Sequence, residues 1–168
     1  MAVMSERIEF TGATGAKLAA RLDRPAAAPV AYALFAHCFT CSKDSFAAAR
    51  IAQGLVAHGI ATLRFDFTGL GASGGDFANT NFSSNVADLV AAADYLRAHL
   101  AAPKILIGHS LGGAAILAAA GRIPEAAAVV TIGAPAEPDH VLKLLSTAIP
   151  EVQRSGSAKV ELAGRAFT

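Results

Sequence analysis

The segment from Lys104 to Ala120 constrains the fold more than any other part of the chain. It begins with an apolar run, breaks at Gly108-His109-Ser110-Leu111-Gly112, and continues at once into an alanine-rich stretch of helical character. Gly108 and Gly112 let the backbone turn tightly, because a side chain at either position would crowd the turn. The pattern predicts a buried strand that passes directly into a helix and holds a serine hydroxyl clear of the backbone.

Strands and helices alternate along most of the remaining sequence. Near-continuous apolar runs predict strands buried on both faces at Ala31–His37, Ile60–Phe65, Lys104–Ile107 and Ala128–Ile132. One helix is expected after an N-cap at Ser45 to about His58, ended by Gly59, and another after an N-cap at Ser83 or Ser84 to about Leu100. Two more are expected from the turn to about Arg122 and over Asp139–Leu145. This alternation predicts an α/β fold with a mostly parallel, doubly wound sheet that helices cover on both faces.

The two ends of the chain depart from this alternation. Near the N-terminus, Arg7–Phe10 and Lys17–Leu22 flank a turn-rich stretch, which predicts an antiparallel edge of the sheet. Near the C-terminus, Val160 and Leu162 lie in an alternating segment, and Arg165–Thr168 reads as a strand that returns beside it. Natural domains seldom end on a strand with an unpaired edge. We therefore expect a single domain over residues 1–168 that is truncated, with a sheet incomplete at the C-terminus.

Composition excludes several classes of function. Hydrophobic residues make up 54% and charged residues 16% of the 168 residues, and the net charge is +1 with both signs interspersed. No basic stripe indicates a nucleic-acid partner. No apolar run approaches the ~20 residues that cross a bilayer, and the N-terminus lacks the pattern of a signal peptide. With only two cysteines there is no disulfide scaffold, and a cytoplasmic location is expected.

Ser110 is the candidate nucleophile. A serine between a buried strand and a helix suits nucleophilic attack on a carbonyl, whereas the alternative is a turn whose serine only caps the helix. The N–H of Leu111, at the start of the helix, would then point at a developing oxyanion. A serine also needs a base and an orienting acid, and none is identified in this chain.

The loop after the first buried parallel strand holds the second group of candidates. In such folds this loop supplies the other oxyanion donor, and here the N–H of Phe39 is the natural one. We interpret His37 as a residue that orders the loop and not as the catalytic base. Cys38 and Cys41 form a C-x-x-C that reads as structural thiols, as a redox-responsive pair or as half of a metal site. No second cysteine pair or histidine pair has ligand spacing, so no metal site is assigned.

The remaining candidates have plainer interpretations. Asp66 follows a strand and is expected to shape its turn through hydrogen bonds to the backbone. Asp139 and His140 could be imagined as triad members, but neighbours at a helix start rarely converge on one serine. Gly69-x-Gly71-x-x-Gly74, in a loop expected to be flexible, and Thr11-Gly12-Ala13-Thr14-Gly15 resemble dinucleotide motifs. Neither opens a helix, so nucleotide binding is not expected.

Three stretches together resemble the α/β-hydrolase family, in its serine-esterase and serine-peptidase-like branch. They are the turn around Ser110, the strand end His37-Cys38-Phe39, and the loop RFDFTGLGAS, in the family's order along nearly the whole chain. More narrowly, AHCFTCSKDS, RFDFTGLGASGGDFANTNFSSNVADL and IGHSLGGAA are similar to the hydrolase half of bacterial bifunctional proteins, which carry an OsmC-like redox domain downstream. Cys38 stands where the wider family has glycine.

The resemblance implies an eight-stranded, mostly parallel sheet and a Ser-Asp-His triad whose acid and base lie beyond the matched residues. It makes Ser110 the nucleophile of an acyl-enzyme mechanism on small-molecule esters or amides, with Phe39 and Leu111 as oxyanion donors and with no cofactor. As given, the chain is expected to be weakly active or inactive. Two alternatives stay open: a noncatalytic binding module with the same fold, and a thiol-redox accessory that acts through Cys38 and Cys41.

Overall fold

The computed structural model describes residues 3–136, 149–156, 158–162 and 165–167. The chain divides into two compact units, Met1–Ala134 and Pro135–Thr168, each described by itself. The helix expected over Asp139–Leu145 lies outside the described residues. The prediction of one domain over the whole chain stays a prediction.

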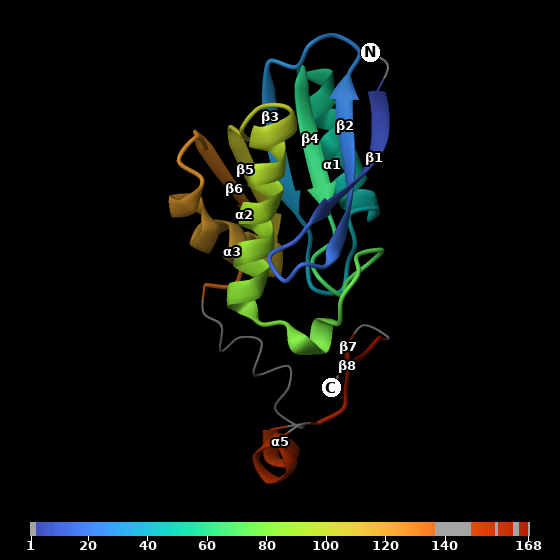
Figure 1. Ribbon diagram of the computed structural model, residues 1–168, viewed down its shortest axis with the longest axis vertical. Helices are drawn as coiled ribbons and strands as arrows, with labels where there is room; N and C mark the ends of the chain where they lie inside the picture. The colour runs from blue at the N-terminus through green and yellow to red at the C-terminus, as the bar shows by residue number, and fades with distance from the viewer. Residues whose placement is uncertain (1–2, 137–148, 157, 163–164, 168) are drawn as a thin grey trace. The chain divides into compact units, whose positions relative to one another are not determined.

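Six strands of the first unit's described residues form one sheet (Figure 1). Its order is β1-β2-β4-β3-β5-β6, with β1 and β2 antiparallel to each other, β2 antiparallel to β4, and β4, β3, β5 and β6 mutually parallel. The strands are β1 (Val3–Thr11), β2 (Lys17–Pro25), β3 (Ala31–Ala36), β4 (Ile60–Phe65), β5 (Ile105–His109) and β6 (Ala128–Ile132). The mostly parallel sheet with an antiparallel N-terminal edge is confirmed.

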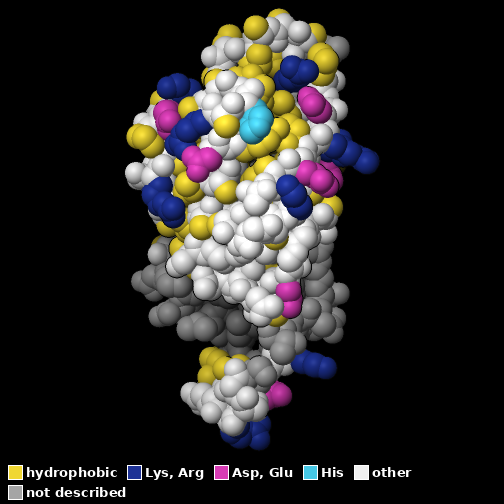
Figure 2. All heavy atoms as spheres, viewed as in Figure 1, with side chains coloured by type: hydrophobic (Ala, Val, Ile, Leu, Met, Phe, Trp, Pro, Cys, Tyr) yellow, Lys and Arg dark blue, Asp and Glu magenta, His cyan; other side chains and the backbone are white. Residues whose placement is uncertain are grey.

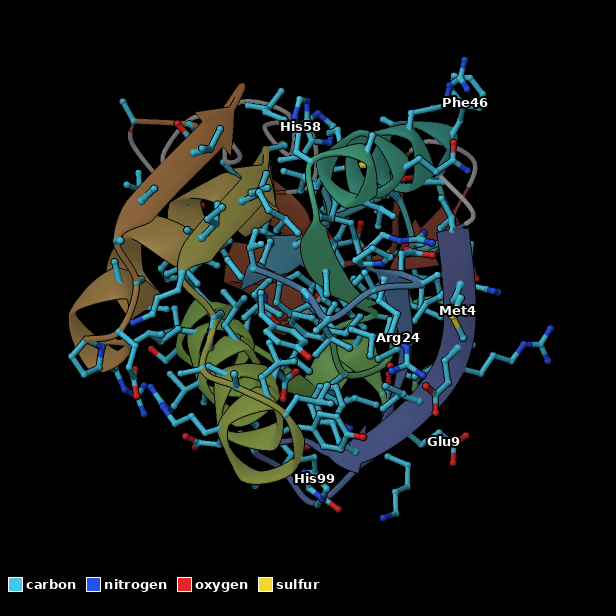
Figure 3. All side chains as sticks on the ribbon, turned by 90° about the horizontal axis from the view of Figure 1, so that it is seen from above. Met4, Glu9, Arg24, Phe46, His58 and His99 are labelled. Atoms are coloured by element: carbon cyan, nitrogen blue, oxygen red, sulfur yellow. A yellow bond between two sulfur atoms is a disulfide. The ribbon has the colours of Figure 1, made fainter. Side chains whose placement is uncertain are left out.

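Helices cover both faces of this sheet, as the alternation predicts. On one face lie α2 (Phe82–His99) and α3 (Leu111–Ala119), which pack with Leu34, Leu63 and Leu106 into the larger core cluster (Figure 1). On the other face α1 (Phe46–Ala57) buries Ala48 against Phe35 and a second, smaller cluster. Seen from above, Phe46 and His99 lie at the outside of the unit, on opposite sides of the sheet (Figure 3).

The helix ends agree with the sequence signals except at one cap. Ser45 is the N-cap residue of α1, and Gly59, with φ of 80°, follows the end of that helix. The cap of α2 was expected at Ser83 or Ser84 but is Asn81, whose side-chain oxygen accepts a hydrogen bond from the Ser84 N–H at 2.9 Å. The Ser84 hydroxyl accepts in turn from the Asn81 N–H, so Ser84 is the third residue of a capping box.

Two further expectations need correction. The strand at Ala128–Ile132 was expected to be buried, but β6 is the edge of the sheet, and the side chains of Val129, Val130 and Ile132 are 39–45% exposed. The loop over Gly69–Gly75 was expected to be flexible, but hydrogen bonds hold it: the Gly69 N–H donates to the Gly74 carbonyl, and the Gly74 N–H donates to the Lys17 carbonyl. The side chains of β6 are exposed because of its position at the edge of the sheet. The loop is ordered because its backbone pairs with a distant strand.

Short elements complete the description. Two 3₁₀ turns, η1 (Phe77–Asn79) and η2 (Ala120–Arg122), follow the Gly-rich loop and α3. In the second unit, α5 (Ile149–Ser155) precedes β7 (Val160–Leu162) and β8 (Arg165–Phe167), which pair antiparallel and confirm the expected hairpin. Among the described residues, no helix is both long and apolar enough to cross a membrane. Charges of both signs are interspersed over the face in Figure 2.

Candidate active site at the carboxyl ends of the parallel strands

The carboxyl ends of β3, β4 and β5 bring three loops to one edge of the sheet. Ala36, the last residue of β3, is in register with Phe65 on β4 and with Gly108 on β5. The residues that follow these strands therefore start from adjacent positions. In open parallel sheets this edge is where ligands bind.

Ser110 lies in a strained turn between β5 and α3. Its φ is 53° and its ψ is −118°, and it is the one non-glycine residue with positive φ among the described residues. Two backbone hydrogen bonds fix the turn: the Ser110 N–H donates to the Ile132 carbonyl at 2.9 Å, and the Gly113 N–H donates to the Ser110 carbonyl. A non-glycine residue in such a conformation is expected at functional sites.

Glycines make this turn sterically feasible, as the sequence predicts. A Cβ on Gly108 would collide with the backbone of Gly112, and a Cβ on Gly112 would collide with the carbonyl groups of Ala36 and His37. The start of α3 therefore packs directly on the end of β3. This contact places Ser110 beside the loop that contains Cys38 and Phe39.

The hydroxyl of Ser110 has no hydrogen-bond partner within the described part of the chain, so it does not cap α3. Leu111 is the first residue of α3. The first N–H groups of a helix have no partner inside the helix, and the helix dipole adds positive potential there. This position is compatible with the predicted roles of Ser110 as nucleophile and of the Leu111 N–H as oxyanion donor, which stay predictions. Asp139 and His140, considered as triad members, lie outside the described residues.

The loop after β3 contains a disulfide. Cys38 and Cys41 are bonded to each other, and the Cys41 N–H donates to the Cys38 carbonyl at 3.1 Å, which closes a tight turn. Phe39 lies inside this turn, and its ring contacts the ring of Phe77 edge-on at 4.9 Å between centroids. The two cysteines are therefore not the structural thiols that the first interpretation of the C-x-x-C expected. The structure tests neither the redox response nor the role of the Phe39 N–H.

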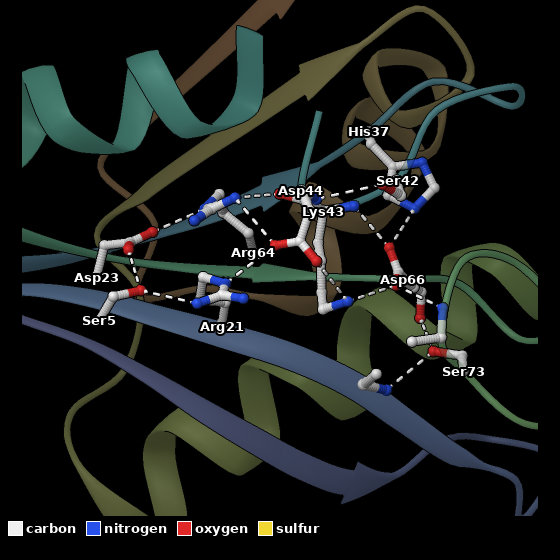
Figure 4. A network of polar contacts seen from close by, with 12 residues as sticks. Ser5, Arg21, Asp23, His37, Ser42, Lys43, Asp44, Arg64, Asp66 and Ser73 are labelled. Carbon is white, nitrogen blue, oxygen red and sulfur yellow. Dashed lines mark hydrogen bonds and ion pairs between the residues drawn. The ribbon is translucent and has the colours of Figure 1, made fainter. Parts of the chain in front are cut away.

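A buried polar network supports this loop from below (Figure 4). The fully buried carboxylate of Asp66 accepts hydrogen bonds from the Lys43 N–H at 2.6 Å and from the Ala72 N–H at 2.9 Å. The Lys43 ammonium lies 2.9 Å from the same carboxylate. Asp66 therefore orders two loops through backbone contacts, which agrees with the turn-shaping role expected from the sequence.

His37 is part of the same network. It is buried, its Nε2 lies 3.4 Å from Asp66 Oδ1, and its Nδ1 lies 2.6 Å from the Cys38 carbonyl oxygen. Burial raises the pKa of Asp66, but the nearby imidazole of His37 and the hydrogen bonds from Ala72 and Lys43 outweigh it and hold this pKa well below the usual range. These contacts agree with a histidine that orders the loop.

The sequence did not reveal two features of this region. Lys43 is buried and paired with Asp66, although lysine is usually exposed. His109 reaches the two cysteines, and one ligand atom from each of the three residues lies within 4.8 Å of the others. Both contacts join segments far apart in the chain, so no local pattern indicates them.

A separate pocket of about 420 Å³ lies beside the β1–β2 turn and is lined by Thr14, Gly15, Ala16, Thr68, Gly75, Asp76, Asn79 and Thr80. Residues near both dinucleotide-like motifs line it, but it does not contain Ser110. The Asp76 carboxylate would repel a phosphate. The absence of nucleotide binding stays a prediction.

Comparison with known proteins identifies the family. A model of the alpha/beta hydrolase family matches residues 33–167. The chain belongs to the alpha/beta hydrolase family. The mostly parallel sheet and the strand-to-helix turn around Ser110 are those that the resemblance implied. Of the eight sheet strands that it implied, the described residues place six in one sheet, and β7 and β8 form a separate pair. No match was found among curated proteins.

Solved structures that match this chain include one with high sequence identity. The esterase domain of a Rhodothermus marinus protein is 50% identical, with a TM-score of 0.73 over 98% of this chain and 64% of that one. Est1E from Butyrivibrio proteoclasticus, solved with ferulic acid bound, is 23% identical over 96% of this chain and 67% of that one, with a TM-score of 0.73. A hydrolase from Agrobacterium vitis is 20% identical over 100% of this chain and 69% of that one, with a TM-score of 0.74. The chain thus spans less than two thirds of the Rhodothermus domain. The Butyrivibrio and Agrobacterium proteins, at 23% and 20% identity, show a similarity of fold alone.

Proposed function

We propose that this chain carries the nucleophile of a serine hydrolase that cleaves small-molecule esters or amides through an acyl-enzyme on Ser110. The strained backbone of Ser110 is the observation that carries the proposal. Strain of about 1–3 kcal/mol persists only where the surrounding structure imposes it, and a cap or a plain turn would not require it. The 50% identity to an esterase domain supports an ester as the first substrate class to test.

In the proposed reaction the Ser110 hydroxyl oxygen attacks the carbonyl carbon and its proton passes to a general base. The alcohol or amine then leaves, and water hydrolyses the acyl-serine. The N–H groups of Leu111 and Phe39 hold the oxyanion that forms in each step. The part of the chain that the structure describes brings no histidine or carboxylate to the Ser110 hydroxyl. Residues 1–168 alone should therefore hydrolyse esters slowly or not at all.

Turnover of nitrophenyl esters of increasing acyl length tests this proposal on the protein as its gene encodes it. Ser110→Ala should lower kcat by about 10⁴–10⁶, as removal of a triad nucleophile does. Thr40→Ala is the matched control in the neighbouring loop and should keep turnover within about tenfold. Absence of turnover in the wild type together with binding of the ester would favour a noncatalytic binding module instead.

A second candidate function has one specific observation in its favour, the Cys38–Cys41 disulfide beside Ser110. In a thiol-redox role, peroxide would oxidise the two thiols to the disulfide, with two water molecules as the reduced product. Peroxide should then inactivate the reduced wild type, a dithiol should restore it, and Cys38→Ser should resist. Equal peroxide sensitivity of the two proteins would eliminate this role.

A further inference from the structure

Three side chains beside the candidate nucleophile form a group that hydrolysis does not require. Cys38 and Cys41 come from the loop after β3, and His109 is the last residue of β5. Their ligand atoms all lie within 4.8 Å of one another. The pairing of β3 with β5 and the close packing of Gly112 on the end of β3 hold the two segments together.

Reduction changes what this group can bind. A dithiol reductant transfers two electrons and two protons, breaks the sulfur–sulfur bond and leaves two cysteine thiols, while it becomes a disulfide itself. Compartments that contain glutathione and thioredoxin keep such pairs reduced. The reduced site offers two sulfurs and one imidazole nitrogen, which are ligands that zinc prefers.

The geometry suits one tetrahedral ion. Bonds of about 2.3 Å to sulfur and about 2.0–2.1 Å to nitrogen place tetrahedral ligand atoms about 3.5–3.8 Å apart. The three atoms lie within 4.8 Å of one another, and the two sulfurs move apart to the tetrahedral separation once the bond between them is broken. Two residues between the cysteines is a usual spacing for zinc ligands. Lys43, two residues beyond Cys41, is no obstacle, because its ammonium lies 2.9 Å from Asp66 and 3.1 Å from Asp44.

We propose that Cys38, Cys41 and His109 bind one zinc ion when the disulfide is reduced, with a water molecule as the fourth ligand. Binding releases the two thiol protons, because thiolates are the ligands. The loop around Phe39 is then fixed by the disulfide when oxidised and by the ion when reduced. Sequence spacing could not indicate this site, since the third ligand lies far along the chain. The proposal does not depend on hydrolysis, because ion binding is measured without a substrate.

The test is a metal titration of the chain after reduction with a phosphine under argon. Co²⁺ should bind one ion per chain and produce a thiolate-to-cobalt charge-transfer band together with the visible bands of a tetrahedral site. Zn²⁺ should then displace it and remove both signals. Competition with a chromophoric chelator gives the affinity, and circular dichroism checks that each variant is folded.

Variants assign the ligands. Cys38→Ser and Cys41→Ser each remove one thiolate, so each variant should show a weaker thiolate-to-cobalt charge-transfer band than the wild type. Mutation of a residue that only hydrogen-bonds to a metal ligand lowers metal affinity by about 10–100-fold. His109→Gln removes a ligand itself and should lower the affinity at least as much. His58→Gln is the matched control and should bind like the wild type, because His58 lies between the end of α1 and the start of β4, at the opposite edge of the sheet from the carboxyl ends of the strands. Absence of a stoichiometric ion, equal affinity in the oxidised protein, or wild-type affinity in His109→Gln would overturn the proposal.

Discussion

Ser110 combines a side chain and a backbone conformation that rarely occur together. With φ of 53° and ψ of −118°, it occupies a region that glycine enters without penalty. We attribute this strain to the exposure of a nucleophile. The strain should therefore lower the stability of the folded protein.

Ser110→Gly should raise the free energy of unfolding by about 1 kcal/mol relative to Ser110→Ala. Glycine relieves about 1–3 kcal/mol of strain, which the greater freedom of glycine in the unfolded chain partly offsets. Urea unfolding of the two variants measures the difference, and both lack the hydroxyl. Equal stability, or a less stable glycine variant, would show that the turn is not strained.

Two glycine-to-alanine changes should have opposite signs. Gly112→Ala should lower the free energy of unfolding by about 1–3 kcal/mol, because its methyl group meets the Ala36 and His37 carbonyls. Gly54→Ala, inside α1 with nothing within 4 Å of the new Cβ, should raise it by about 0.5–1 kcal/mol. Chemical denaturation of both variants tests the close packing of α3 on β3. The same sign in both would contradict it.

At the scale of elements, the loops after β3 and β4 depend on Asp66. Because its folded pKa is below the unfolded value of about 3.9, its charge stabilises the protein above about pH 4. That contribution is lost as the pH falls further, toward the folded pKa.

Asp66→Asn should therefore lower stability at pH 7 and flatten the acid side of the stability profile. The cost at pH 7 should be near the lower end of the roughly 3–5 kcal/mol for a broken buried pair, because Asp44 still faces Lys43. Thermal unfolding of the wild type and the variant between pH 7 and pH 2 measures both effects. If the stability of the wild type and of Asp66→Asn falls with the same slope below about pH 4, Asp66 does not contribute to the acid dependence of stability.

A second buried pair joins the antiparallel edge to the parallel part of the sheet (Figure 4). Arg64 on β4 donates to Asp23 on β2 at 2.7 Å, and the Ser5 hydroxyl on β1 donates to the same carboxylate at 2.7 Å. Arg64 and Asp23 are at most 4% exposed. Three strands thus share one charge pair.

Asp23→Ala should cost about 3 kcal/mol, near the lower end of the range for a broken buried pair, since it removes the carboxylate 2.7 Å from Arg64 while Asp44 stays 3.9 Å away. The double variant Asp23→Leu/Arg64→Met should recover most of that loss, because apolar replacement of a whole buried pair is often close to neutral. Urea unfolding of the wild type, the single and the double variant completes the comparison. A double variant no more stable than Asp23→Ala would contradict the pairing.

For the whole molecule, local sequence patterns predicted the features that depend on residues close together in the chain. The alternation of apolar runs and helices gave the parallel sheet, and the glycines around Ser110 gave the turn. Contacts that depend on strand order were not predictable in this way. The Lys43–Asp66 pair and the approach of His109 to the cysteines need β3 to lie between β4 and β5, and the exposure of Val130 needs β6 to be the edge. The cap at Asn81 was missed because Ser83 and Ser84 satisfy the same sequence rule.

Covalent labelling decides whether Ser110 is a nucleophile. The protein as its gene encodes it is treated with a fluorophosphonate, digested and mapped by mass spectrometry. We predict one phosphonylated residue, Ser110, and no label after Ser110→Ala. Label on another residue, or an encoded protein that never reacts, would contradict this prediction.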